Sequence, residues 1–239
     1  MTATADLAII LKANDQASAV LKAAGAHAQG LGASLSSVSK IAAGFVIGTA
    51  LTQLPNVIGD LVSKASEAED VSAALNAVLQ STAGVSGMTR EKVIALADSL
   101  SQVTKFDDEA IISGQNLLLT FTGIGQQVFP QATEAMLNMS TALGQDLKSS
   151  AIQLGKALND PIGGVTALRR VGVQLSDAQQ TLIEKMVKAG DIMGAQKVIL
   201  KELETEFGGA AKAAGQTMGG QLAILGNQID NVKEEIGAA

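Results

Sequence analysis

Residues 176–207 read SDAQQTLIEKMVKAGDIMGAQKVILKELETEF, and this stretch predicts two helices in succession. Ser176 followed by Gln179 is the pattern of a capping box, in which both side chains bond the backbone of the first helical turn. Asp191 is a favourable N-cap residue for a second helix. Apolar residues recur in both segments at helical spacing, so each helix has one apolar face. The two predicted helices cover 176–189 and 191–207.

Helix signals of the same kind recur from Glu67 onward. Thr89 is a favourable N-cap residue, and Pro130 suits a first helical turn. The acidic run 107–109 predicts a helix start, because negative charge complements the macrodipole there. Two Gly-Gly pairs predict a hinged start to the last helix. Further predicted helices cover 147–158, 165–171 and 210–236, the last with an apolar stripe of Leu222, Leu225, Ile229, Val232 and Ile236.

The composition favours the same fold class over the whole chain of 239 residues. Hydrophobic residues make up 47% but aromatic residues only 2%, so the interior is built from aliphatic side chains, which suit helices better than sheets. We expect an all-α fold, with short amphipathic helices in an irregular bundle and longer N- and C-terminal helices. Alternation of Leu7, Ile9 and Leu11 predicts one short N-terminal strand. No heptad pattern is sustained over the many turns of a rod-like coiled coil.

Residues 41–59 form a run of 19 residues without a formal charge. Gly44 and Gly48 stand at GxxxG spacing, which lets a partner helix approach closely. The run is long enough to span a bilayer at roughly 28 Å, but Pro55 interrupts it and two amides are costly in lipid. The pattern favours a helix buried against copies of itself or another protein, with a membrane-active segment as the alternative. The residues predicted for this packing are Ile41, Gly44, Phe45, Ile47, Gly48 and Leu51.

We therefore expect four parts of the chain. They are an N-terminal strand and helix at 1–39, the apolar helix at 40–66, a helical domain at 67–207 and an Ala/Gly-rich C-terminal helix at 208–239.

The residue types argue against an enzyme and against a cofactor or metal site. Cysteine is absent, which removes thiolate chemistry, and His27 is the only histidine, which leaves almost nothing from which to build Ser-His pairs or multi-histidine metal sites. No P-loop, GxSxG, HExxH or EF-hand pattern occurs. Because the side chains of 107–109 point in different directions on a helix, they indicate a helix cap and not a cation site. The net charge of −6 argues against direct nucleic-acid binding.

Several stretches together resemble tail tape measure proteins of tailed phages and prophages. The stretches are AIQLGKALNDPIGGVTALRRVGV at 151–173, its continuation at 175–211, LLLTFTGIG at 117–125 and ANDQASAVLK after the predicted strand. The most specific part of the resemblance is the run Leu154, Gly155, Lys156, Ala157, Leu158, Asn159, Asp160 and Pro161.

The resemblance implies a non-enzymatic virion protein that fills the tail tube, sets tail length and aids genome ejection. It implies contacts with the tail tube protein, tail assembly chaperones and tail tip proteins. The apolar run at 41–59 predicts, in addition, self-association into a homo-oligomer. The expected location is the tail lumen of the virion, with the host cytoplasm during assembly and transient contact of 41–59 with the host membrane at ejection.

The chain departs from the family in its length, since a helix of 239 residues reaches only roughly 360 Å and family members are commonly several times longer. It resembles the N-terminal region and not a complete ruler. The alternative from another class is a pore former or toxin that uses 41–59.

Overall fold

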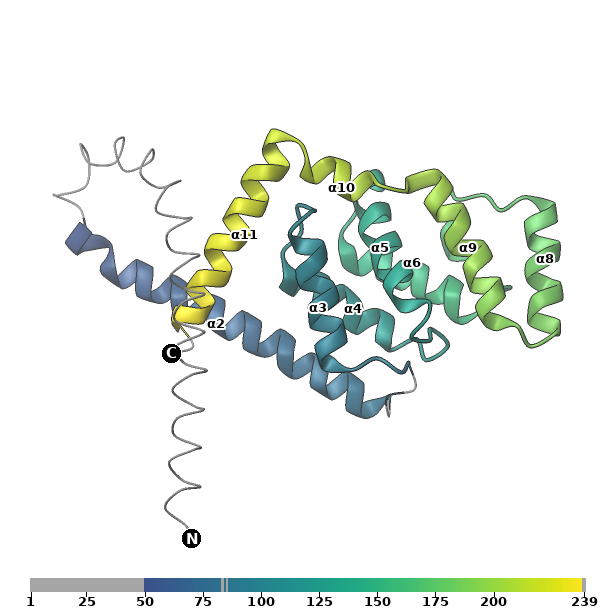
Figure 1. Ribbon diagram of the computed structural model, residues 1–239, viewed down its shortest axis with the longest axis horizontal. Helices are drawn as coiled ribbons and strands as arrows, with labels where there is room; N and C mark the ends of the chain where they lie inside the picture. The colour runs from purple at the N-terminus through teal and green to yellow at the C-terminus, as the bar shows by residue number, and fades with distance from the viewer. Residues whose placement is uncertain (1–49, 83, 85, 238–239) are drawn as a thin grey trace, which may run out of the picture. The chain divides into compact units, whose positions relative to one another are not determined.

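The structure, a computed structural model, describes residues 50–82, 84 and 86–237, and every secondary-structure element within these residues is a helix (Figure 1). The predicted all-α fold is confirmed for this part of the chain. The predicted strand at 7–11 lies outside the described residues. The chain divides into two compact units, 1–58 and 59–239, and the description below concerns the second.

The helices follow one another with short connections. The helix α2 runs without a break through Pro55 and through the division expected between residues 66 and 67. The elements are α2 (Ala50–Ser81), α3 (Arg90–Ser101), α4 (Asp108–Leu119), α5 (Phe129–Leu143), α6 (Leu147–Asn159), α7 (Thr166–Arg169), α8 (Asp177–Lys188), α9 (Ile192–Phe207), α10 (Ala210–Gly215) and α11 (Met218–Gly237).

The helix starts lie where the cap residues predict them. The side chain of Asp107 accepts a hydrogen bond from the backbone N–H of Ala110, and α4 begins at the next residue. Ser176 forms the complete capping box with Gln179 at the start of α8. Pro130 lies in the first turn of α5. These contacts satisfy backbone N–H groups that have no partner within the helix. Thr89 and Asp191 cap α3 and α9 in the same way.

Two predicted helices differ from the structure. The helix expected at 165–171 is only the four-residue α7. On both sides of α7 the backbone N–H groups bond carbonyl groups three residues earlier, as in a 3₁₀ turn. The segment ends at Gly172, whose φ is 100°. The helix expected at 210–236 is divided into α10 and α11. At this break Gly215 packs so closely on Val103 that a Cβ atom would lie 2.4 Å from its carbonyl oxygen. The chain turns at this contact, and Thr217 then caps α11 through the N–H of Gly220.

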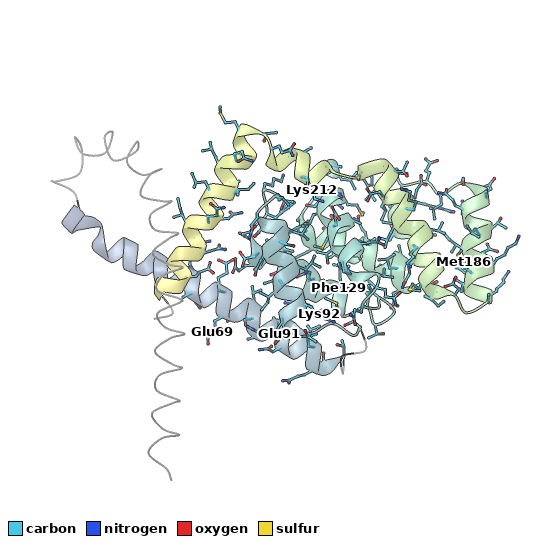
Figure 2. The ribbon with its side chains drawn as sticks, in the orientation of Figure 1. Glu69, Glu91, Lys92, Phe129, Met186 and Lys212 are labelled. Atoms are coloured by element: carbon cyan, nitrogen blue, oxygen red, sulfur yellow. The ribbon has the colours of Figure 1, made fainter. Side chains whose placement is uncertain are left out.

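The interior is aliphatic, as the composition predicts. In the bundle, α4 packs against α3, α5 and α6, while α5 also packs against α9 and α10 (Figure 1). Phe129 is fully buried among the side chains of this bundle (Figure 2). Other fully buried large side chains are Leu75, Ile111, Leu118, Met136, Leu137, Leu154, Leu158 and Leu168.

Polar contacts fix α10 on α5, and so determine where α11 begins. The buried Asn138 side chain accepts a hydrogen bond from the backbone N–H of Ala211 (2.9 Å). Lys212, labelled in Figure 2, pairs with Glu134 at 2.6 Å. From α10 the chain continues into α11, which returns to α2 (Figure 1), where Lys64 pairs with Asp230 at 3.3 Å.

Candidate functional site

The packing segment predicted at 41–51 lies almost entirely outside the described residues. This holds for Ile41, Gly44, Phe45, Ile47 and Gly48. Leu51 lies in the first turn of α2, and nothing is described of its side chain. Among the helices that the structure describes, none combines the length and the hydropathy needed to cross a bilayer.

The second predicted group, residues 154–161, forms the last turns of α6 and the bend that follows. Leu154, Ala157 and Leu158 are buried in the core, and Pro161 is buried after the helix ends. Lys156, Asn159 and Asp160 are exposed. Gly155 is buried beside the ring of Phe121, in the connection between α4 and α5. The run therefore has one face in the core and one face in solvent.

The exposed polar residues of this run bond the backbone around them. The Asn159 Oδ1 atom accepts a hydrogen bond from the N–H of Gly123 at 3.0 Å. The Asp160 Oδ1 atom accepts from the N–H groups of Ile162 (3.2 Å) and Gly163 (3.0 Å). A Cβ atom on Gly164 would lie 1.9 Å from the carbonyl oxygen of Lys156, so the bend admits only glycine there. These side chains hold the bend and the neighbouring connection in place.

Gln196 of α9 completes this arrangement, and the sequence analysis did not identify it. Its side chain is 2% exposed, and its Nε2 atom donates to the carbonyl oxygens of Gly123 (2.7 Å) and Leu158 (2.9 Å). The available signal was a polar residue on the apolar face of α9, next to Ala195 and one turn before Leu200. We call Phe121, Gly123, 154–164 and Gln196 the α6 junction. Its hydrogen bonds join three segments of the fold.

The second notable surface is the outer face of α11, which we define as Met218, Leu222, Leu225 and Ile229. These side chains have exposed fractions of 83%, 64%, 47% and 46%. The stripe was predicted from its spacing, but most helical stripes of this kind face the core of their own domain. Here the inward side of α11 instead carries Ile224, which is 8% exposed, together with small and polar residues.

Polar contacts hold the C-terminal half of α11 on α2 and α4. The Nδ2 atom of Asn231 donates to Oδ1 of Asp108 at 3.2 Å. Lys64 pairs with Asp230, and both side chains are about one-third exposed. The inward side of α11 therefore carries its contacts with the rest of the unit, while its apolar outer face is directed to solvent.

Two carboxyl groups meet at the same contact. Burial, followed by the negative charge of Asp108, raises the pKa of Glu109 to about 8. Burial also raises the pKa of Glu234 on α11, and the two carboxyl groups hydrogen-bond each other. A proton shared between them explains how two acidic side chains lie together at neutral pH. The sequence predicts Glu109 only at a helix start and gives no indication of this pair.

The carboxyl pair lines an open groove of about 730 Å³ between α2, α3, α4 and α11. Arg90 also lines this groove, and its side chain donates to Ser72. Within residues 50–82, 84 and 86–237, no three carboxylate, imidazole or thiolate side chains are placed to hold a metal ion. The groove can hold a proton at Glu109 and Glu234, and Ser66 and Ser72 also line it.

Comparisons of the chain with models of protein families, with curated proteins and with solved structures find no match. Support for a function therefore comes from the residues and contacts described above.

Proposed function

We propose that the chain is a non-enzymatic structural and assembly component of a phage tail that resembles the N-terminal part of a tape measure protein. The observation that carries the proposal is the outer face of α11, an apolar helix surface presented to solvent by an otherwise well-packed helical unit. Apolar patches of this kind on a folded protein mark sites of interaction with other proteins. A protein that acts by packing helices against its neighbours needs such a surface and no reactive group.

The α6 junction supports the same proposal. Residues 154–161 are the most specific part of the resemblance, and each described contact of this run is with the chain's own backbone or core. Asn159 and Asp160 stabilise a bend through these contacts, which suits a protein whose helices must keep a fixed arrangement.

The partners proposed from the resemblance are the tail tube protein, tail assembly chaperones and tail tip proteins. The proposed location is the tail lumen of the virion, with the host cytoplasm during assembly. Residues 41–59 would then be stored against partner helices and contact the host membrane at ejection.

The proposal is tested in the strain that carries the gene. Particles are purified after induction, and their proteins are identified by mass spectrometry. We expect peptides from 59–237 in intact tails, and we expect deletion of the codons for this unit to abolish tails of normal length in electron micrographs. Tails of unchanged length and number after the deletion would overturn the proposal. A peptide covering 38–62 that permeabilises liposomes, combined with unchanged tails, would instead favour the pore-former alternative.

A further inference from the structure

We infer that the outer face of α11 binds the same face of a second copy of this chain, with the two helices antiparallel. The exposed fractions of Met218 and Leu222, 83% and 64%, are high for large apolar side chains. Both follow directly after α10, which is held on α5 by Asn138 and Lys212, so the start of α11 has a fixed position. The face is thus presented on a helix that is held from its other side by the contacts of Asp230 and Asn231.

The spacing of the outer face indicates another helix as its occupant. Its four residues are separated by four, three and four positions. This 4-3-4 order is the heptad spacing of helices that pair along a narrow apolar seam. In the sequence, Val232 and Ile236 continue the same spacing. The seam is short, so it specifies a pair of helices over about two to three heptads and not a long rod.

The residues beside the seam favour a second copy over a charged partner. Gly219, Gln221, Gly226 and Gln228 flank the seam, and all four are exposed and uncharged. If the face recognised a charged partner helix, acidic or basic residues would stand at these positions to form salt bridges with it. A Cβ atom on Gly226 would meet no other atom within 4 Å, so this side of α11 is open for close approach. Two identical faces with neutral borders can meet without like-charge repulsion.

The helix dipoles set the direction of the pair. In an antiparallel pair the positive N-terminal end of each α11 lies beside the negative C-terminal end of the other copy, whereas in a parallel pair like ends lie side by side.

Two-fold symmetry then fixes which positions meet, because a residue i that contacts j also has j contacting i. Placing the axis near residue 227 sets Leu225 of each copy against Ile229 of the other. It also brings the two Gly226 positions together, while the two Met218 positions are separated by roughly 27 Å along the helices. This pairing does not depend on the phage-tail assignment.

The absence of cysteine from the chain allows a site-specific test with the full-length protein. We make Gly226→Cys and Met218→Cys separately, oxidise each at micromolar concentration, and measure the disulfide-linked dimer on non-reducing gels. We expect efficient cross-linking of the Gly226→Cys protein and at least ten-fold less for Met218→Cys. Cross-linking of Met218→Cys alone would show a parallel or different arrangement and would overturn the inference, as would the absence of cross-linking in both.

A second substitution distinguishes cross-linking through the outer face of α11 from cross-linking by random collision. In the Gly226→Cys protein, Leu225→Glu is expected to lower the cross-linked yield at least ten-fold. Leu182→Glu on α8 is the matched control, because Leu182 is 43% exposed and Leu225 is 47% exposed. Equal yields from both variants would overturn the inference. Since cross-linking is measured on purified protein, its result is independent of whether deletion of the unit affects tails.

Discussion

Gly155 of α6 lies so close to Phe121 that a Cβ atom at this position would be 2.2 Å from the ring carbons Cδ2 and Cε2. Real Cβ atoms do not approach other atoms this closely, so any side chain here must displace the ring. We expect Gly155→Ala to lower the free energy of unfolding by about 1–3 kcal/mol, the usual cost of overpacking a core. Chemical denaturation followed by circular dichroism measures this change.

The matched control for this substitution is Gly226→Ala. Both glycines are within helices, but a Cβ atom on Gly226 would meet nothing within 4 Å. Alanine there gains helix propensity without a clash, so we expect the free energy of unfolding to rise by about 0.5–1 kcal/mol. If the free energy of unfolding changes in the same direction in both variants, the packing described for Gly155 is contradicted.

Gln196 contributes to stability through its two backbone contacts. We expect Gln196→Met to lower the free energy of unfolding by about 1–3 kcal/mol, because it removes the donor to the carbonyl oxygens of Gly123 and Leu158. Methionine is similar in length, so the change tests the hydrogen bonds more than the packing. A variant as stable as the wild type would show that these carbonyl groups find other partners.

These contacts indicate which parts of the fold are open to prediction from sequence. The caps at Asp107, Ser176 and Asp191 were predicted because each side chain bonds a backbone group only three residues away. Residues 154–161 were predicted as a family motif, but the contacts that join them to the rest of the α6 junction were not. Gln196 bonds carbonyl groups 38 and 73 residues away, and no local pattern specifies such partners.

The solvent exposure of the α11 stripe and the Glu109–Glu234 pair were not predicted, for a related reason. The apolar stripe of α11 is evident from its spacing, but spacing does not determine whether the stripe faces its own domain or solvent. An acidic residue in a first helical turn is normally a favourable surface charge. Only the approach of α11, 125 positions later in the sequence, buries Glu109 and places a second carboxyl group against it.

Gln115 of α4 offers the opposite case to Gln196. Its side chain is fully buried, and within the described part of the chain neither its amide nitrogen nor its amide oxygen has a hydrogen-bond partner. Burying an unsatisfied amide costs free energy, so we expect Gln115→Met to raise the free energy of unfolding by about 1–3 kcal/mol. The same substitution at two buried glutamines should therefore change stability in opposite directions. Destabilisation of the Gln115→Met protein would show that this amide has a bonding partner.

The stability of the protein should fall as the pH rises from about 4.5 to about 8. The pKa of Glu109 is raised to about 8 in the folded state, first by burial and then by Asp108 and Glu234. In this pH interval the unfolded chain releases the proton that the folded protein retains, so the unfolded state is favoured progressively. Below pH 4.5 both states bind the proton, and above pH 8 neither does, so the contribution is constant outside the interval. The free energy of unfolding measured at several pH values tests this dependence.

The substitution Glu109→Gln isolates this effect, because glutamine keeps the shape of the protonated acid and cannot ionise. At pH 8.5 we expect the variant to be more stable than the wild type by about 1–2 kcal/mol, after allowance for the partial solvent exposure of the site. At pH 4.5 the two proteins should be equally stable. Glu204→Gln, on the exposed side of α9, is the control and should show no such pH-dependent difference. If Glu109→Gln instead destabilises the protein at pH 8.5, the carboxylate makes a favourable contact in the folded state, and the raised pKa assigned to Glu109 is wrong.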